Sequence, residues 1–198
     1  MYTDGSKNDN DCTGSGIYIK YQDQVVKVQK RNPDFCSVFR SELIAINEGL
    51  DLLKSITHKS EIWILSDSRS SIQHLANWHS VRDNVGVEIL KKLKRLSLSH
   101  QIHLQWIPSH VGIEGNEIAD TLAKAGASEA SVLTASLTSL EIFSRVKSQN
   151  KTTWLVTPIH HWYRSSRPGG SLTLDYNRQD QTTLTRFLSG HIRAMKYS

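Results

Sequence analysis

The most constraining feature of this sequence is a short apolar run, Ile62-Trp63-Ile64-Leu65, with polar residues on both sides. Because four apolar residues in succession leave neither side of a strand polar, the run predicts a strand that is covered on both faces. Such a strand belongs in a sheet with helices packed against it. Asp67 comes just after the run, at the end of a strand where open α/β sheets commonly place their ligands.

Four further segments complete the predicted strands. β-branched residues in Gly16–Tyr21 and Gln24–Lys30 flank the turn-like pair Gln22-Asp23, which indicates a hairpin. Tyr2-Thr3 is the expected stump of a first strand beside this hairpin. Apolar residues alternate in Ile102–Trp106 and predict a half-buried last strand.

Helical patterns lie between and after these strands. Apolar residues with the spacing of one helical face run from Val38 to Ile56, and Ser37 is available as the N-cap. Further helices are predicted at Ser68–Trp78, at Val87–Leu98, and from Asn116 as the cap to Gly126. The order of strands and helices requires a mixed sheet flanked by helices, an α/β fold.

The formal net charge of +5 comes from the end of the chain. Residues 131–198 contain 9 Lys and Arg against 3 Asp and Glu, whereas residues 1–130 contain 15 against 16. A basic segment suits a polyanionic partner, although an inert, solvated tail explains the charge equally well.

The periodic patterns weaken after Ala130. Thr138–Gln149 and Gln179–Leu188 have helical patterns, and Arg164–Ser171 has the composition of a loop. We therefore expect one domain over residues 1–128 and a basic, partly helical appendage over residues 129–198.

Composition excludes several other classes of protein. Hydrophobic residues make up 38% and charged residues 22% of the chain, and no run of about 18 apolar residues could span a bilayer. No secretory signal precedes the first strand, so we expect an intracellular protein, in the nucleus or the cytoplasm. Cys12 and Cys36 are too few for a disulfide framework and do not form a zinc-binding pair, so we expect reduced thiols and no zinc.

Four carboxylates stand at the ends of elements that should meet at one edge of the sheet. Each of them has an ordinary interpretation when taken alone: Asp4 as part of a turn, Glu42 as a surface residue, Asp67 as a helix N-cap, and Asp120 as a solvated helix residue. Their joint placement favours a single site. Clustered carboxylates are the ligands that divalent cations prefer when they catalyse phosphodiester hydrolysis.

The residues around these carboxylates resemble a known family. Tyr-Thr-Asp4-Gly-Ser, Arg40-Ser-Glu42-Leu, Leu-Ser-Asp67-Ser and Pro108-Ser-His-Val-Gly-Ile-Glu-Gly-Asn-Glu-Ile-Ala-Asp120 resemble the type 1 ribonuclease H family over about residues 1–128. The last motif is similar to the ribonuclease H domains of non-LTR retrotransposon polyproteins. The stretch from Trp154 to His191 is similar to the segment on the C-terminal side of those domains.

This resemblance implies a ribonuclease H-like mixed sheet of five strands and a metal-dependent endonuclease that cuts the RNA strand of RNA–DNA hybrids. It implies two Mg²⁺ ions, with Mn²⁺ able to substitute. Asp4 is expected to bridge both ions, Glu42 and Asp67 to complete the first site, and Asp120 to hold the second. His110 matches a mobile histidine that assists proton transfer or product release.

Contacts to the hybrid are expected beside these residues. One group could read the 2′-hydroxyls and the phosphates near the carboxylates, and a basic helix could bind the duplex backbone, although charge runs are usually solvated helix faces. The residues are Ser6, Ser68 and Arg69 near the carboxylates and Lys91, Lys92, Lys94 and Arg95 on the basic helix. Asn116 as a cap and Glu117 as a first-turn residue are assigned structural roles only.

Two alternatives remain open from the sequence. The chain begins three residues before Asp4, so a truncated first strand could leave an inactive remnant that still binds nucleic acid. An integrase-like nuclease, acting on duplex DNA with a related sheet, is the second alternative, and the motif from His110 to Asp120 argues against it. The protein is expected to be a monomer or a part of a larger polyprotein with reverse transcriptase.

Overall fold

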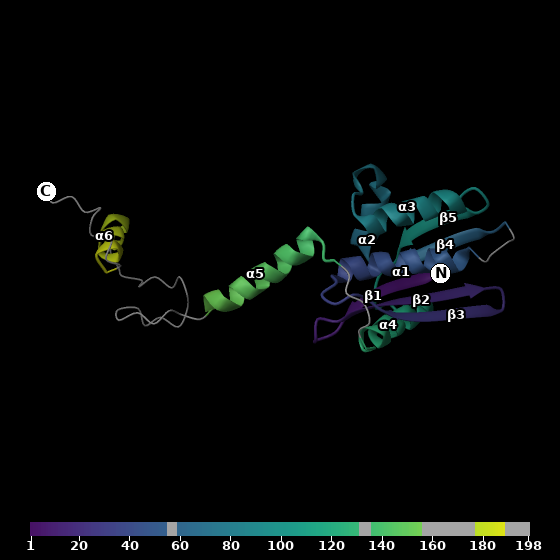
Figure 1. Cartoon of the computed structure of the whole chain (residues 1–198), viewed down its shortest axis with the longest axis horizontal. Helices are drawn as coiled ribbons and strands as arrows, with labels where there is room; N and C mark the ends of the chain where they lie inside the picture. The colour runs from purple at the N-terminus through teal and green to yellow at the C-terminus, as the bar shows by residue number, and fades with distance from the viewer. Residues whose placement is uncertain (55–58, 131–135, 156–176, 189–198) are drawn as a thin grey trace. The chain divides into compact units, whose positions relative to one another are not determined.

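The sheet has five strands in the order β3-β2-β1-β4-β5 (Figure 1). The structure is a computed structural model that describes residues 1–54, 59–130, 136–155 and 177–188. β1 pairs with β2, and β2 with β3, in antiparallel fashion, whereas β1 with β4 and β4 with β5 are parallel. The predicted mixed sheet is thus confirmed. The strands are β1 (Tyr2–Lys7), β2 (Thr13–Tyr21), β3 (Gln24–Arg31), β4 (Glu61–Ser66) and β5 (Gln101–Trp106).

The helices occur in the predicted order, with shifted ends. Ser37 caps the first of them, since its hydroxyl accepts from Arg40 N, but Asp83 caps α3 by accepting from Gly86 N and starts it earlier than predicted. The predicted end of the first helix at Ile56 and the predicted loop Arg164–Ser171 lie outside the described residues. The helices are α1 (Val38–Leu53), α2 (Arg69–Ala76), a 3₁₀ turn η1 (Trp78–Ser80), α3 (Asn84–Leu96), α4 (Glu114–Ala127), α5 (Ser139–Leu155) and α6 (Arg178–Leu188).

The chain divides into two compact units, residues 1–141 and residues 142–198. The first unit contains the sheet and the helices α1 to α4. In the second unit, α6 is capped by Asn177, whose side-chain oxygen accepts from Asp180 N at 2.9 Å. No helix in the described ranges has the length and apolar character needed to cross a bilayer.

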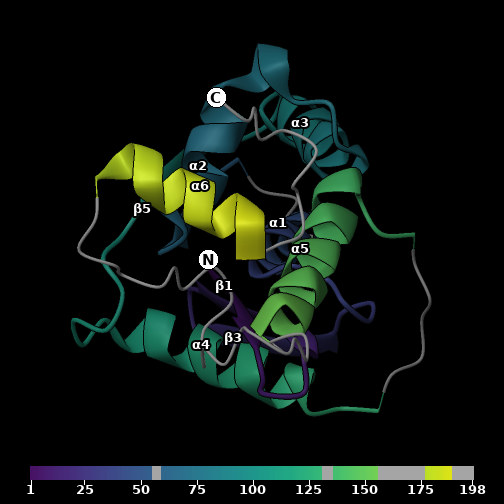
Figure 2. The same cartoon turned by 90° about the vertical axis from the view of Figure 1, so that its left-hand side faces the viewer.

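Helices cover both faces of the central strands, with α1 on one side of β1 and α4 on the other (Figures 1 and 2). Alternation along β2 explains this layering. Ile17 and Ile19 join the apolar core with α1 and β4, whereas a Cβ at Gly16 would lie 2.0 Å from Ala119 O of α4. The core is formed by Ile17, Ile19, Leu43, Ala45, Ile46, Leu50, Leu53, Ile62, Ile64, Leu75, Ile89 and Leu96.

The first strand is longer than the sequence pattern predicted. Asp4 lies inside β1 and not after it, because Gly5 and Ser6 continue the antiparallel pairing with Ser15 and Gly14. Gly5 is therefore a strand residue and not part of a turn. A Cβ at this position would lie 2.5 Å from Glu42 N, so the glycine permits α1 to approach β1 closely.

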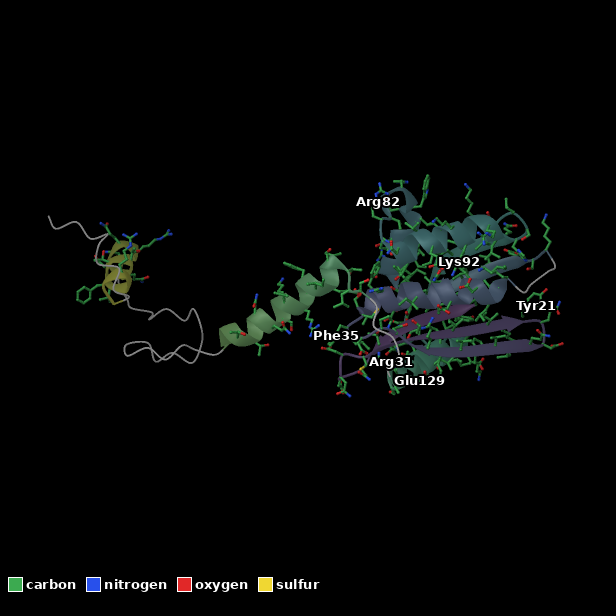
Figure 3. All side chains as sticks on the ribbon, viewed as in Figure 1. Tyr21, Arg31, Phe35, Arg82, Lys92 and Glu129 are labelled. Atoms are coloured by element: carbon green, nitrogen blue, oxygen red, sulfur yellow. The ribbon has the colours of Figure 1, made fainter. Side chains whose placement is uncertain are left out.

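Lys92 joins α3 to α1 inside the protein (Figure 3). Its side chain is only 9% exposed, and Nζ lies 2.6 Å from Asp51, 2.9 Å from Glu88 and 3.2 Å from Asn47 O. The run of basic residues in the sequence placed Lys92 on the predicted nucleic-acid-binding face of this helix. The structure corrects that prediction, because the ammonium group is engaged by α1 and by the preceding turn of its own helix.

The carboxylate of Glu141, at the end of the first unit, accepts hydrogen bonds at the N-termini of two helices, α1 and α5. Glu141 Oε1 accepts from Ser37 N at 2.9 Å and from the Ser37 hydroxyl, at the start of α1. Glu141 Oε2 accepts from Thr138 N at 2.9 Å, at the start of α5, and from Arg40 Nη1 at 3.1 Å. Burial raises the pKa of Glu141, but hydrogen bonds from Thr138 and Ser37 outweigh this effect, so the pKa is lowered overall.

We expect Glu141→Gln to lower the free energy of unfolding by about 1–3 kcal/mol, because hydrogen bonds to a buried charged acceptor are lost. Chemical denaturation of the whole chain at neutral pH measures the change. Glu129→Gln is the matched control, since Glu129 accepts from Gln29 at the exposed surface. An equal loss in both variants would contradict the role of Glu141.

The same carboxylate should make the stability depend on pH. A lowered folded pKa contributes stability that is complete above the ordinary value of 4.5 and is lost as the pH falls through the folded pKa. The difference in stability between wild type and Glu141→Gln should therefore shrink below about pH 4.5. If the difference in stability between the two proteins stayed constant down to acid unfolding, the charge of Glu141 would not be what stabilises the starts of α1 and α5.

Candidate active site

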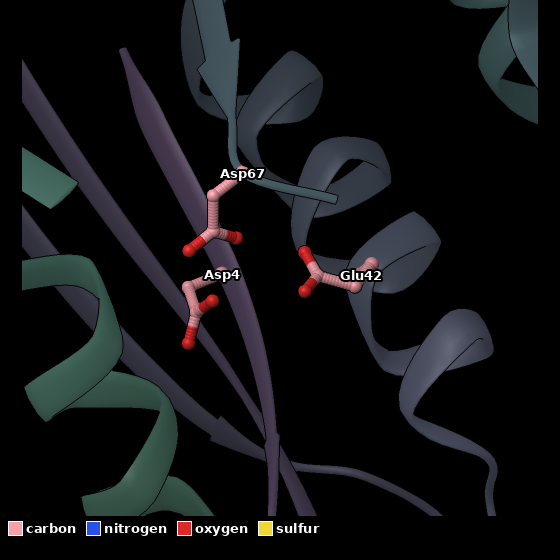
Figure 4. A group of neighbouring side chains, drawn as sticks. All are labelled: Asp4, Glu42 and Asp67. Carbon is pink, nitrogen blue, oxygen red and sulfur yellow. The ribbon is translucent and has the colours of Figure 1, made fainter. Parts of the chain in front are cut away.

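Three carboxylates from three elements converge at one edge of the sheet. Figure 4 shows Asp4 of β1, Glu42 of α1 and Asp67, at the end of β4, with their oxygens directed toward one another. One oxygen from each lies within 4.8 Å of the others. The parallel pairing of Tyr2 with Leu65 and of Thr3 with Ser66 continues toward Asp4 and Asp67, which explains why these two side chains are neighbours.

Burial and mutual repulsion both act on this carboxylate cluster, the three residues Asp4, Glu42 and Asp67. Burial, with the charges of Asp67 and Asp120, raises the pKa of Asp4 to about 7. Burial, with the charges of Asp4 and Asp67, raises the pKa of Glu42 well above its ordinary value. Within the described part of the chain Glu42 Oε2 is buried without a hydrogen-bond partner. The cluster is thus short of positive charge.

Asp67 is free to face the cluster because another residue caps the next helix. Ser68 is the N-cap of α2 and accepts from Ser71 N, so the alternative that Asp67 caps this helix is wrong. The main chain of Asp67 is fixed by Trp106, whose Nε1 donates to Asp67 O at 3.0 Å. Its carboxylate accepts from Asn116 Nδ2 at 3.1 Å.

Asn116 lies within the last sequence motif and was assigned a structural role only, but its side chain contacts the carboxylate cluster. It was predicted to cap the helix that ends at Gly126, but this helix, α4, begins at Glu114 after the extended residue Ile113, so Asn116 lies within its first turn. Asn116 is 4% exposed and directs its amide to Asp67. The available signal was its spacing from Asp120, because residues four apart share one side of a helix.

Asp120 lies beside the three-residue cluster without being part of it. Its charge contributes to the raised pKa of Asp4. Asp120 Oδ2 lies 2.6 Å from Lys124 Nζ, one turn further along α4, and the Asp120 side chain is 25% exposed. Of the four predicted carboxylates, the structure therefore brings three together and places the fourth at their border.

The other predicted site residues lie at least partly at the surface, apart from Lys92. His110 is exposed and has a positive φ of 56° in the turn before α4, and no described contact joins it to the carboxylates. Ser6 and Ser68 are partly exposed. The side chain of Arg69 is exposed. The basic face of α3 consists of three exposed residues, Lys91, Lys94 and Arg95, and does not include Lys92.

Known proteins share both the sequence and the fold of this region. Ribonuclease H of Orientia tsutsugamushi is 32% identical over 142 residues, which cover 66% of this chain and 82% of that protein. Ribonuclease HI of Helicobacter pylori is 32% identical over 131 residues, covering 63% and 89%. The crystal structure of RNase H1 from Halobacterium salinarum superposes with a TM-score of 0.51 at 18% identity, covering 65% and 96%.

The solved structure of an N-terminal RNase H domain from Mycobacterium tuberculosis gives the same TM-score, 0.51, and covers 63% of this chain and 89% of its own. These likenesses show an RNase H-like α/β fold. The model of the RNase H family matches residues 1–128, which include Asp4, Glu42, Asp67 and Asp120. The chain therefore belongs to the RNase H family and is, by family and by the names of its relatives, a ribonuclease H.

Proposed function

We propose that this chain is a metal-dependent endonuclease that hydrolyses the RNA strand of RNA–DNA hybrids. The observation that carries the proposal is the cluster of Asp4, Glu42 and Asp67, with one oxygen from each within 4.8 Å of the others. Folding holds these like charges together although they repel one another, which favours a function that supplies positive charge from outside.

The residues of the cluster fit magnesium. Mg²⁺ prefers carboxylate oxygens, and Glu42 Oε2 is a buried acceptor without a partner among the described residues. We propose that Asp4 would serve both of two Mg²⁺ ions, that Glu42 and Asp67 would complete the first site, and that Asp120 would hold the second, with Mn²⁺ able to substitute. When bound, two such ions supply an activated water and a positive charge for the leaving oxygen.

The chain's own residues orient this site. Asn116 fixes one oxygen of Asp67, and the close approach at Gly5 holds Glu42 against Asp4. His110, exposed on the turn before α4, is proposed to carry a proton or to assist product release. Its exposed side chain is available to a bound substrate, as this role requires.

The hybrid is proposed to contact two exposed groups of residues. Ser6, Ser68 and Arg69 lie next to Asp4 and Asp67 in the sequence, so they can contact sugars and phosphates at the cut strand. The exposed basic residues of α3, which are Lys91, Lys94 and Arg95, are proposed to bind the duplex backbone. Lys92 is left out because its ammonium group is bound inside the protein.

Cleavage of a labelled RNA–DNA hybrid in magnesium tests the activity. We expect Asp67→Asn to reduce the rate by about 10²-fold or more, because a metal ligand contributes several kcal/mol to transition-state stabilisation. Asp23→Asn, in the exposed turn between β2 and β3, removes the same charge away from the site and should cleave like wild type.

The same assay separates the two alternative functions. A folded wild type that binds the hybrid and never cuts it, with magnesium or with manganese, would establish an inactive nucleic-acid-binding remnant. Cleavage of duplex DNA as fast as the hybrid would instead favour an integrase-like nuclease. Cleavage of the hybrid alone is the outcome that the proposal requires.

The carboxylate cluster should also make the metal-free protein sensitive to pH. The folded pKa of Asp4, about 7, exceeds its ordinary value of 3.8, so between these values the folded state binds more protons and stability falls as the pH rises. In EDTA we expect the melting temperature to fall from pH 5 to pH 7, and less steeply in Asp4→Asn.

Millimolar Mg²⁺ at pH 7.5 should raise the melting temperature of the wild type again, because the cation binds only the folded site. A magnesium-independent melting temperature would exclude the proposed metal site.

The basic face of α3 should determine part of the salt dependence of hybrid binding. In the Asp67→Asn background, replacing Lys94 and Arg95 by Gln should lower the slope of log Kd against log salt by about 1 for each lost phosphate contact. Lys20 and Lys27, both exposed on the β2–β3 hairpin, supply a control with the same change of charge. Equal effects of both double variants would rule out a specific role for α3.

We further propose that the chain lies within a retrotransposon or is derived from one. It is proposed to be a monomer or a part of a larger polyprotein with reverse transcriptase. The resemblance of the motif from Pro108 to Asp120 motivates this proposal, whereas the relatives named above are bacterial and archaeal ribonucleases H and carry nothing specific to retrotransposons. A reverse transcriptase reading frame continuous with this chain in the transcript would support the proposal. The division at residue 128 and an intracellular location remain predictions.

A further inference from the structure

Lys124 is the one basic residue in the described part of the chain that forms an ion pair with any of the four carboxylates. Its Nζ lies 2.6 Å from Asp120 Oδ2, and the Lys124 side chain is 61% exposed. Asp4, Glu42 and Asp67 have no such partner among the described residues. The positive charge at this site is therefore confined to its outer border.

The geometry of α4 holds this pair in place. Asp120 precedes Lys124 by four residues, the favourable orientation for an ion pair on a helix. Lys124 also lies in the last turn of α4, where the helix dipole favours a cation. The hydrogen bond to Asp120 raises the pKa of Lys124, and the charges of Asp120 and Asp4 contribute to the increase, so the field of the cluster reaches this side chain.

An exposed pair of this kind is usually a minor contribution to helix stability. Here, however, the paired carboxylate is the one proposed to hold the second cation. A cation that binds Asp120 has to displace the ammonium group or share the carboxylate with it, and it is repelled by the lysine charge in either case. The long, exposed stem of Lys124 allows the ammonium group to withdraw.

We propose that Lys124 is an internal counter-ion that competes with the second divalent cation for Asp120, and so sets the metal concentration at which that site fills. This inference rests on the proposed function, since it requires a cation at Asp120. It predicts two unequal sites: the cluster of Asp4, Glu42 and Asp67 binds tightly, and the site at Asp120 binds more weakly. Lys124 is thus a positioning residue for the metal and not a catalytic residue.

Isothermal titration of the full chain with Mn²⁺, and then with Mg²⁺, measures this competition without an activity assay. We expect Lys124→Gln to tighten the weaker site by about three- to tenfold and to leave the tighter site unchanged. Lys124→Arg keeps the charge and should titrate like wild type. Lys54→Gln is the control for net charge. It removes an exposed lysine that pairs with Asp51 at the C-terminal end of α1, whereas Glu42 lies near the N-terminal end of that helix.

Asp120→Asn separates the failure of this inference from the failure of the proposed metal site. If wild type binds two cations and Asp120→Asn loses the weaker one, an unchanged or weaker affinity in Lys124→Gln overturns the role of Lys124 alone. If wild type binds no divalent cation, the proposed metal site fails and this inference fails with it. Equal tightening by Lys54→Gln would reduce the effect to net charge and would also overturn the inference.

Discussion

The close approach of β1 to α1 at Gly5 is the constraint on which the site depends. A side chain there would meet Glu42 N at 2.5 Å and the adjoining backbone of Ser41 at 2.8 Å, so no other residue fits without moving the helix. The first turn of α1 is also held by β2, the neighbouring strand, because the hydroxyl of Ser15, which pairs with Gly5, donates to Ser41 O at 2.7 Å. Moving α1 outward would break this contact and would separate Glu42 from Asp4.

Holding three carboxylates together opposes folding, and the layers around them compensate. Leu43 and Ile46, just after Glu42 on α1, lie in the apolar core, and Ile64 lies on the strand that ends just before Asp67. Burial of each such side chain contributes about 1.5–3 kcal/mol. Because a cation binds the folded site and not the unfolded chain, the same repulsion that costs stability in the metal-free protein couples metal binding to folding.

Local patterns in the sequence predicted most of the sheet, and they failed where a partner distant in sequence decides the structure. β4 and β5 were recognisable from apolar runs and alternation. β1 was predicted too short, because Asp4 and Gly5 have the composition of a turn and their pairing with β2 leaves no local trace. Lys92 was grouped by charge with its neighbours, although its spacing of three from the buried Ile89 was a signal that it faces inward.

The last helix of the first unit shows why the carboxylates alone were an incomplete description of the site. Asn116, Asp120 and Lys124 are spaced by four residues, so α4 presents them on one side in successive turns. Asn116 contacts Asp67, and Asp120 adds a negative charge beside Asp4. Lys124 forms an ion pair with Asp120. Sequence motifs single out Asp120 because its residue type suggests chemistry. The helical period adds the two residues that determine how Asp67 is oriented and how much negative charge Asp120 presents to a cation.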